Sequence, residues 1–345
     1  MRIGENPTKF ARHNPDLVRL QVKVPEAVLA ATVTYIPRLA DYYADALEVL
    51  KASIHSLRAT MNVPFDLLVY DNGSCPQAVD FLRGLLEQGA IQWLWLSGGN
   101  MKKVGAWSHI FGAAQADYVY FFDCDILHRP GWFERSQEVL EAFPQVGTVN
   151  AAPVPMKGKA LQEATLASTF ARAQADPETT VEFGQFTDDE CFLTLGESLG
   201  ADPAKYLERA RRFEQVRVTR NGVGAFIQSW HAQFLAPSEV LRRFFPAHRE
   251  WAAGHSDRAF DEFLNEAGYM RLSTLEPLVV HLGNTVSERH REEVERITGL
   301  ALARSRLARH EGGPARRLMR LPGMGRLVRR IHGLTFELLY NVKCR

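Results

Sequence analysis

The feature that most constrains the fold is an alternation, between residues 28 and 154, of short apolar runs with longer helix-like segments. The apolar runs have the length and the β-branched or aromatic content of strands, and they are residues 31–37, 65–71, 91–96 and 118–123. The segments between them have the apolar spacing of helices, and they are residues 41–60, 77–88 and 104–116. This alternation predicts an α/β fold with a mainly parallel sheet covered by helices on both faces. Ligands of such sheets bind beyond the carboxyl ends of the strands.

The remainder of the chain is less regular. Residues 157–215 are polar and helix-prone, which predicts a helical insertion. A strand-like stretch (222–237), a helix-like stretch (257–268) and an apolar strand (275–284) follow. The predicted divisions of the chain are residues 1–27, 28–156, 157–215, 216–290 and 291–345.

Composition places the chain among globular proteins. Its 345 residues are 46% hydrophobic, and no apolar run reaches the roughly 18 to 20 residues that span a bilayer. The N-terminus has no apolar signal segment, so we expect a cytoplasmic protein. The four cysteines are scattered without CxxC spacing, which argues against a disulfide framework and against a zinc site.

The net charge of +1 conceals an asymmetry, because residues 301–345 carry a net charge of +9 and the rest of the chain −8. In this tail Leu327, Ile331, Leu334 and Leu338 fall at helical spacing beside arginines, which predicts an amphipathic cationic helix. Such a helix is typical of a protein that lies on an anionic membrane surface. The alternative is a solvated tail.

Two carboxylates follow the predicted strand 118–123 in the sequence YVYFFDCD. Asp123 and Asp125 stand directly after five apolar or aromatic residues, where a desolvated carboxylate pair repels itself unless a cation or hydrogen-bond donors compensate. Carboxylate oxygens are the ligands of Mg²⁺ or Mn²⁺, which complete their shells with phosphate oxygens and water. The pair therefore indicates a metal-assisted diphosphate site.

These motifs together resemble the nucleotide-binding half of the GT-A glycosyltransferases, in particular the inverting family-2 enzymes that use nucleoside-diphosphate sugars. The stretches that carry the resemblance are VTYIP, VYDNGS, GGN at 98–100, GAWSHIFGAAQADYVYFFDCD and GWF at 131–133. Weaker similarity extends through GVGAF at 222–226, SDRAFDEFLNEAGY at 256–269 and VVHLGN at 279–284. The resemblance implies a GT-A fold with a nucleotide-sugar-binding half at 28–156 and an acceptor-binding half at 216–290. Residues 1–27, 157–215 and the helical basic tail 291–345 are not explained by it.

The resemblance implies a nucleotide site at the ends of the first strands. Tyr35 and Pro37 match the family's base pocket, and Asp71 of VYDNGS matches the residue that contacts the base or ribose. Asn100 matches the asparagine after the third strand, and Asp123 the ribose-side contact. For Asp71 the alternative is an Asx turn, which the sequence DNGS also favours.

The resemblance also implies a Mn²⁺ or Mg²⁺ site. Asp125 matches the direct metal ligand, and Asp123 a ligand that contacts the metal directly or through water. Many relatives have a third acid where this chain has Ile126, so Asp125 and a distant partner are expected to hold the metal. His281 matches the third ligand of some GT-A enzymes, and the alternative is a polar residue at a strand end.

The expected catalytic base is Asp257, because an inverting transfer needs a group that removes the proton of the acceptor hydroxyl. Asp257 matches the second acid of the family's E-D-x-D motif, whereas Ser256 and Ala259 replace its other acids. The alternative is a helix-terminal acid that interacts with the helix dipole.

A lysine pair and an aromatic pair could each have a functional or a structural role. Lys102 and Lys103 follow Asn100 and either contact the diphosphate or are solvated. Trp230 and Phe234 of SWHAQF either stack on a sugar or belong to the core.

The predicted function is that of a metal-dependent, hexosyltransferase-like enzyme that moves a sugar from a nucleoside-diphosphate sugar, first of all a UDP-sugar, to a hydroxyl of a saccharide or lipid-linked acceptor with inversion. The resemblance implies a role in the synthesis of surface polysaccharides or glycolipids, as is common for bacterial enzymes of this kind. We expect a cytoplasmic enzyme, or a peripheral one at the inner membrane face, and no nucleic-acid partner. The alternatives are a non-catalytic nucleotide-sugar or carbohydrate-binding protein of the same fold and a sugar-phosphate nucleotidyltransferase. A dehydrogenase is excluded, because the first strand is not followed by GxGxxG.

Overall fold

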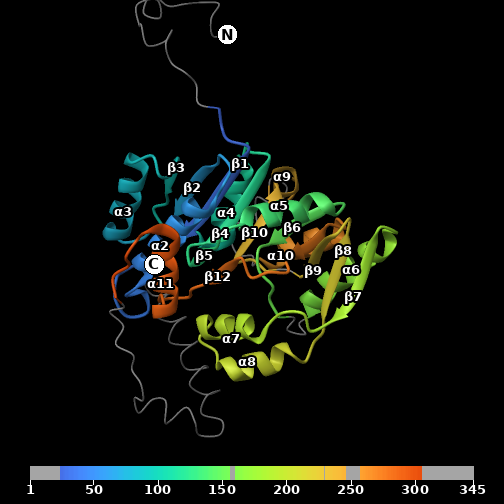
Figure 1. Ribbon diagram of the computed structural model, residues 1–345. Helices are drawn as coiled ribbons and strands as arrows, with labels where there is room; N and C mark the ends of the chain where they lie inside the picture. The colour runs from blue at the N-terminus through green and yellow to red at the C-terminus, as the bar shows by residue number, and fades with distance from the viewer. Residues whose placement is uncertain (1–23, 156–159, 229, 246–256, 305–345) are drawn as a thin grey trace, which may run out of the picture. The chain divides into compact units, whose positions relative to one another are not determined.

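A computed structural model describes residues 24–155, 160–228, 230–245 and 257–304 (Figure 1). The chain divides after Arg304 into two compact units, and every described residue belongs to the first. Most of the predicted extension 1–27 and the predicted amphipathic helix of the tail lie outside the described residues. Within the ranges given above, no helix is both long enough and apolar enough to cross a membrane.

One sheet of ten strands organises the described unit, in the order β3-β2-β1-β4-β10-β6-β11-β9-β8-β7. These strands are β1 (Val28–Thr34), β2 (Asp66–Asp71), β3 (Trp93–Leu96), β4 (Tyr118–Asp123), β6 (Val146–Asn150), β7 (Thr179–Gly184), β8 (Gln215–Arg220), β9 (Val223–Ile227), β10 (Gln233–Pro237) and β11 (Met270–Ser273). A second, two-stranded sheet pairs β5 (Ile126–His128) with β12 (Val279–His281) in antiparallel orientation.

The parallel unit predicted from the sequence forms the first half of the large sheet. β3, β2, β1 and β4 are parallel neighbours, which places their carboxyl ends along one edge. β10 then lies antiparallel between β4 and β6, and β11 is parallel to β6. The predicted α/β class is confirmed. The predicted strand-like stretch 222–237 contains two strands, β9 and β10, which are not neighbours in the sheet.

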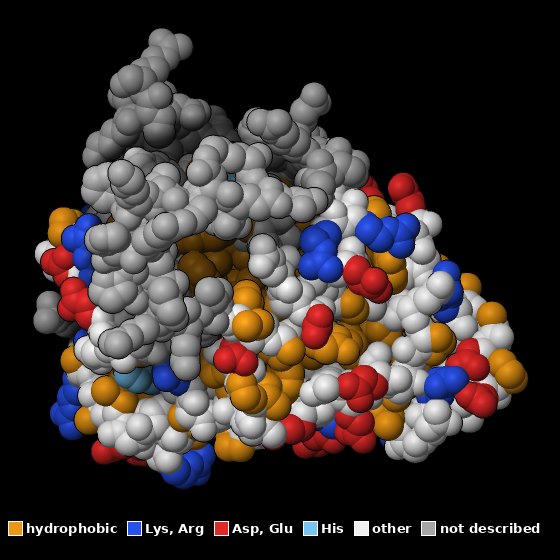
Figure 2. Space-filling view, turned by 90° about the horizontal axis from the view of Figure 1, so that it is seen from above, with side chains coloured by type: hydrophobic (Ala, Val, Ile, Leu, Met, Phe, Trp, Pro, Cys, Tyr) orange, Lys and Arg blue, Asp and Glu red, His pale blue; other side chains and the backbone are white. Residues whose placement is uncertain are grey.

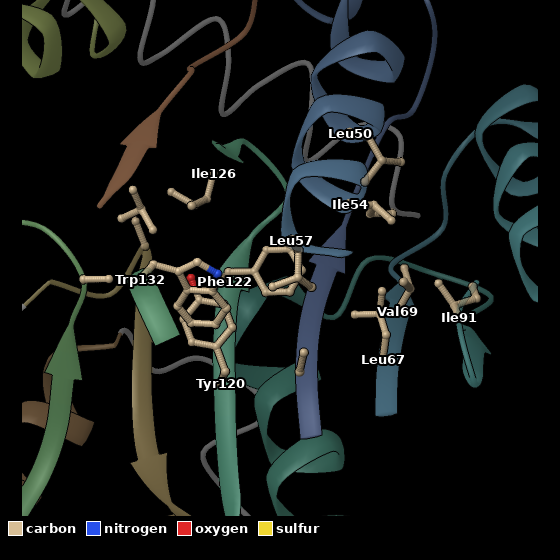
Figure 3. Packing of buried hydrophobic residues seen from close by; sticks show 14 of the residues in the cluster. Leu50, Ile54, Leu57, Leu67, Val69, Ile91, Tyr120, Phe122, Ile126 and Trp132 are labelled. Atoms are coloured by element: carbon tan, nitrogen blue, oxygen red, sulfur yellow. The ribbon is translucent and has the colours of Figure 1, made fainter. Parts of the chain in front are cut away.

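Helices cover both faces of the sheet (Figure 1). The helices are η1 (Asp41–Tyr43), α2 (Ala46–Thr60), α3 (Pro76–Glu87), α4 (Lys102–Ala113), α5 (Trp132–Ala142), α6 (Ala160–Ala175), α7 (Asp189–Ser198), α8 (Pro203–Ala210), α9 (Ser238–Phe244), α10 (Arg258–Glu266) and α11 (Glu288–Thr298). On one face, Leu50, Ile54 and Leu57 of α2 point toward the strands (Figure 3). On the other face, Trp107 and Phe111 of α4 pack with α9 and α10.

Strand β4 is buried on both faces, as its continuous apolar run predicts. Tyr120 and Phe122 face the α2 side, whereas Val119 and Phe121 face the α4 side. This alternation follows from the two-residue period of a strand. Because neither face of β4 contacts solvent, its position and register are fixed by packing, and so is the place where Asp123 leaves the sheet.

The predicted insertion 157–215 contains helices α6, α7 and α8, and it also contains a strand. β7 pairs antiparallel with β8 at the edge of the sheet, which the sequence analysis did not foresee. Its residues are half-buried or exposed, so the strand lacks the apolar period that identifies strands in a sequence. The predicted boundary at residue 290 falls inside α11.

A buried histidine supports the turn that carries Asp123 and Asp125. His128 of β5 is inaccessible to solvent, and its Nε2 lies 2.9 Å from the hydroxyl of Tyr120. Its backbone N–H donates to Ser56 Oγ of α2 at 3.1 Å. Burial lowers the pKa of His128 to about 3, so the folded protein holds this ring neutral at physiological pH.

We predict that His128 makes the protein less stable in mild acid. The unfolded chain binds a proton on this histidine below about pH 6.5, whereas the folded protein does not until about pH 3. The free energy of unfolding should therefore decrease by about 1.4 kcal/mol per pH unit as the pH falls through that window, from this residue alone. Urea unfolding of the wild type and His128→Gln at several pH values measures the difference. Equal pH slopes would contradict the prediction.

Candidate active site

The predicted nucleotide residues lie along the carboxyl edge of the parallel strands. Thr34 pairs with Asp71 and Val33 with Asp123, so the two carboxylates follow β2 and β4 on either side of β1. Their backbones are about 10 Å apart by the spacing of neighbouring strands. The loop after β2 is bound to the end of β1, because Asn72 N donates to Thr34 O at 2.8 Å. The structure thus brings together residues that are far apart in the sequence.

Asp71 forms the Asx turn that was the alternative to a nucleotide contact. Only one of its two carboxylate oxygens takes part in this turn. Its Oδ2 accepts from the backbone N–H groups of Gly73 at 3.2 Å and Ser74 at 3.1 Å. Its Oδ1 is buried and has no hydrogen-bond partner among the described residues. A buried carboxylate oxygen without a donor is costly, so this oxygen is suited to accept from a ligand hydroxyl or N–H group.

Tyr35, Pro37 and Asn100 border the same edge. Tyr35 and Pro37 are half-buried after β1, in a segment that is bound to the loop after β2 by the bond from Ile36 N to Ser74 Oγ at 2.9 Å. Asn100 is exposed, and its Oδ1 accepts from Lys102 N at 2.7 Å at the start of α4. The segments that carry these three residues therefore border the loop that follows Asp71.

Asp123 pairs with a lysine. Lys103 Nζ lies 2.7 Å from Oδ1 and 2.8 Å from Oδ2 of Asp123, and it also donates to the carbonyl oxygen of His231 at 2.8 Å. Burial raises the pKa of Asp123, and the ammonium of Lys103 acts in the opposite direction. From its place after Asn100, Lys103 was expected either to contact the diphosphate or to be solvated. Its contact with Asp123 depends on how α4 packs beside β4.

Asp125 pairs with His281, which lies on β12 in a distant part of the sequence. His281 Nε2 is 3.2 Å from Asp125 Oδ2, and the two residues are brought together by the pairing of β5 with β12. The Oδ1 atom of Asp125 is buried and lacks a hydrogen-bond partner in the described part of the chain.

Ser198 determines which nitrogen of His281 carries a proton. The hydroxyl of Ser198 donates to Leu195 O at 2.9 Å, so it accepts from His281 Nδ1 at 2.9 Å. Nε2 then faces the Asp125 carboxylate, and a cation, either a proton or a metal ion, favours that pair. Burial lowers the pKa of His281, but the hydrogen bond and charge of Asp125 and the charge of Asp123 outweigh it and raise the pKa overall.

The expected metal ligands are only partly assembled. Asp125 and His281 are in contact, whereas Asp123 is bound to Lys103. Among the residues that the structure describes, no group of three or more histidine, cysteine, aspartate or glutamate side chains is arranged to hold a metal. The pair next to the buried Oδ1 of Asp125 is thus the part of the edge that best fits a divalent cation.

Asp257, the expected base, lies at the same corner of the sheet. It precedes α10, its side chain is 43% exposed, and its Oδ2 is 3.1 Å from Nδ1 of His231. Asp257 occupies the N-cap position of α10, so the alternative role of a helix-terminal acid is also compatible with its place. The contact with His231 lowers the pKa of Asp257, so the carboxylate is ionised at neutral pH.

A polar cavity of about 660 Å³ opens beside Asp125 and His281. Its wall combines the end of α7, including Glu197 and Ser198, with the loop after β12, including Asn284. Amide, hydroxyl and carboxylate groups of this kind bind the hydroxyls of polar ligands. The predicted insertion thus contributes a wall to the site through α7. Trp230 lines a smaller adjoining cavity, whereas Phe234 is buried in the core.

Comparison with known families supports the resemblance found in the sequence. Residues 42–185 match the family model described as Glycosyl transferase family 2. The matched segment includes Asp71, Asn100, Asp123 and Asp125. The resemblance to GT-A glycosyltransferases is confirmed. No curated protein sequence matches the chain.

Three solved structures illustrate the likeness to known proteins. S. aureus TarS 1–349 in complex with UDP is 11% identical, with a TM-score of 0.40, and the match covers 79% of this chain and 64% of that one. S. aureus TarS 1–349 in complex with UDP-GlcNAc is 13% identical, with a TM-score of 0.31 and coverages of 49% and 43%. The mannosyltransferase PcManGT from Pyrobaculum calidifontis in complex with GDP-Man and Mn²⁺ is 16% identical, with a TM-score of 0.31 and coverages of 43% and 40%. The matches thus span 40% to 64% of those chains.

We predict that Gly283→Ala disturbs the site more than a matched glycine substitution does. Gly283 has a φ of +71°, and an added Cβ would collide with the backbone carbonyl of Ser198. Gly299 has a φ of +68°, but open space surrounds its Cβ position. Gly299→Ala should therefore lose about 1 kcal/mol of unfolding free energy, from left-handed strain alone. Gly283→Ala should lose roughly 1 to 3 kcal/mol more, from the collision. Urea unfolding of both variants measures the losses, and equal losses would show that α7 does not approach the loop after β12 this closely.

Proposed function

We propose that this chain, in which residues 42–185 match the Glycosyl transferase family 2 model, is an inverting, metal-dependent glycosyltransferase. It moves a sugar from a nucleoside-diphosphate sugar to a hydroxyl group of an acceptor. The observation that carries the proposal is the buried, unpartnered Oδ1 of Asp125 beside His281, at the carboxyl end of β4. Among the described residues, this carboxylate oxygen has no role in holding the fold together.

Asp125 and His281 would hold the metal, and the residues present fit such an ion. The unpartnered carboxylate oxygen and the imidazole Nε2 are an oxygen and a nitrogen donor, a combination that suits Mn²⁺ and, less well, Mg²⁺. Asp123 would act through water or through Lys103. The bound ion would supply positive charge that neutralises the departing diphosphate.

The nucleotide would occupy the edge beside β1 and β2. Tyr35 and Pro37 would line the base pocket, and Asp71 would accept from the base or the ribose through its free Oδ1. Asn100 and Asp123 would complete the ribose side. A UDP-sugar is the first donor to test. A uracil ring offers an N–H group, and a ribose offers hydroxyls, that would satisfy a carboxylate acceptor.

Asp257 would be the catalytic base. It is ionised, partly exposed and located beyond the strands that hold the donor. In the transfer, the O–H bond of the acceptor breaks, and its electron pair forms the bond to the anomeric carbon. The bond from that carbon to the diphosphate oxygen breaks, and its electrons leave with the diphosphate. The proton goes to Asp257, and attack from the face opposite the diphosphate inverts the anomeric centre.

We predict that Asp125→Asn removes the metal dependence of nucleotide binding. The amide keeps the shape of the side chain but loses the charge that attracts the ion. Calorimetry should show that Mn²⁺ tightens UDP binding by at least roughly tenfold in the wild type, and much less in Asp125→Asn. Asp117→Asn is the matched control, because Asp117 is exposed at the opposite end of β4, and it should behave like the wild type.

The proposed metal role would be wrong if UDP bound the wild type equally well with and without Mn²⁺. A thermal-shift panel of nucleotide sugars separates that outcome from failure of the whole proposal. Binding of at least one nucleotide sugar, followed by release of the nucleoside diphosphate with acceptor present, supports the transferase. Binding of a nucleotide sugar without turnover favours the alternative of a non-catalytic nucleotide-sugar-binding protein.

The acceptor would be a saccharide or a lipid-linked saccharide, and the basic tail would hold the enzyme at an anionic membrane surface, such as the inner face of the cytoplasmic membrane. On the face in Figure 2, acidic and basic side chains are interspersed among the described residues. A net charge of +9 within residues 301–345 is thus the strongest concentration of positive charge that the sequence offers.

Deleting residues 315–345 should weaken binding to anionic vesicles, because most of the tail's arginines lie in that segment. Flotation with vesicles of phosphatidylglycerol and phosphatidylcholine measures the effect, and pure phosphatidylcholine vesicles are the control. The full chain should float with the anionic vesicles, and the deletion should float less. Unchanged flotation of the truncated protein would end the membrane proposal.

A further inference from the structure

The Asp257 carboxylate is held by a histidine for which the reaction described above has no role. His231 lies in the segment before β10, and its ring stands between the carboxylates of Asp257, which precedes α10, and Asp261, which lies in α10. Nδ1 is 3.1 Å from Asp257 Oδ2, and Nε2 is 2.8 Å from Asp261 Oδ1. Asp257 and Asp261 are four residues apart, one helical turn, and so they face the same side.

We propose that His231 is the positioning residue of the base: it orients Asp257 and shares the proton that Asp257 takes from the acceptor. This inference rests on the proposed function, because it assigns a partner to the proposed base. The resemblance gives it a chemical reason. Ser256 and Ala259 stand in this chain where the family's motif has its other acids, so Asp257 is the one carboxylate of that motif that remains.

The Nε2 side of the His231 ring is held by Asp261, which belongs to a buried ion pair. Asp261 is buried, and its Oδ1 also contacts the guanidinium of Arg271, which is itself inaccessible to solvent. Arg271 Nη2 donates in addition to Asn265 Oδ1 at 3.0 Å. A carboxylate paired with arginine stays ionised and accepts hydrogen bonds, so Nε2 of His231 is the nitrogen that donates to it.

The other ring nitrogen of His231, Nδ1, therefore faces Asp257. In a neutral ring whose Nε2 carries the proton, Nδ1 offers a lone pair, and the Asp257 carboxylate also offers only lone pairs. Two acceptors at 3.1 Å repel each other, and one proton between them converts the repulsion into a charge-assisted hydrogen bond. The pair thus binds a proton more tightly than an isolated carboxylate does.

Within the part of the chain that the structure describes, four charged groups face the His231 ring, its partners or its backbone. Asp257 precedes α10, Asp261 lies in α10, Arg271 comes from β11, and Lys103 of α4 donates to the His231 carbonyl. Burial lowers the pKa of His231 more than the hydrogen bond and charge of Asp257 raise it, and Lys103 and Arg271 lower it further. The ring is therefore neutral at the pH where Asp257 is ionised, and the pair can accept one proton.

The proton balance of the transfer follows. The proton leaves the acceptor oxygen as that oxygen bonds to the anomeric carbon, and it moves to the Asp257 carboxylate, where Nδ1 of His231 shares it. No oxidant or further reactant is required. Lys103 connects this corner to the donor side, because the same ammonium contacts the His231 carbonyl and both oxygens of Asp123.

The decisive variant is His231→Gln, because a glutamine amide can donate a hydrogen bond to Asp257 but cannot take up a proton. With the donor found in the panel and an acceptor that supports its turnover, kcat should fall by roughly 10²-fold while the dissociation constant of the donor stays unchanged. The acidic limb of the kcat profile should also move to lower pH, because an isolated carboxylate binds a proton less tightly than the pair does. His55→Gln on α2 is the matched control and should change neither quantity. Unchanged kcat and pH profile in His231→Gln would overturn the inference.

A second measurement does not depend on turnover or on the folding of His231→Gln. In protein labelled with ¹⁵N at histidine ring nitrogens, NMR should show His231 protonated at Nε2, and Asp257→Asn should shift its titration to lower pH. A ring protonated at Nδ1, or a titration that Asp257→Asn leaves unmoved, would overturn the inference. If the wild type transfers no sugar but the NMR results are as expected, the proposed function fails and the proton-sharing pair stands.

Discussion

Carboxylates at the end of a buried strand must be compensated by positive charge, and this requirement connects the distant parts of the chain. β4 delivers Asp123 and Asp125 to an edge where solvent screens them poorly. Lys103 from α4 compensates the first, and His281 from β12 faces the second. Each partner comes from an element that packs on a different side of β4. The arrangement of helices and strands around β4 is thereby also the arrangement of the site.

The antiparallel strand β10 is the second element on which the site depends. It lies between β4 and β6, and the segment that precedes it crosses the carboxyl edge of the parallel unit. Asp123 N donates to Ala232 O at 2.7 Å, which fixes this segment beside the end of β4. The adjacent residue, His231, is thereby placed between α10 and Lys103. A parallel strand at this position would enter the sheet from the opposite edge and would place its preceding segment away from the ligands.

The insertion takes part in the site through α7. Ser198, its last residue, fixes the protonated nitrogen of His281, and the close approach of Gly283 to the Ser198 carbonyl keeps α7 against the loop after β12. The cavity beside Asp125 has this helix as one wall. A segment outside the parallel unit thus controls the side chain that faces Asp125.

The sequence by itself determined the parallel unit and the edge at which the carboxylates gather. Apolar runs with helix-length spacing define β1, β2, β3 and β4, and the residues that end them, Asp71 and Asp123, are visible in the sequence because period and polarity are local properties. It could not show that Lys103 contacts Asp123, or that Ser198 and His231 orient His281 and Asp257. These contacts join residues 20 to 83 positions apart, and no local pattern encodes them. The edge strand β7 was likewise invisible, because its exposed faces carry no apolar period. Only the packing of α4, α7 and α10 around β4 decided which cation faces which carboxylate, since the charge compensation depends on distances that the folded chain alone sets.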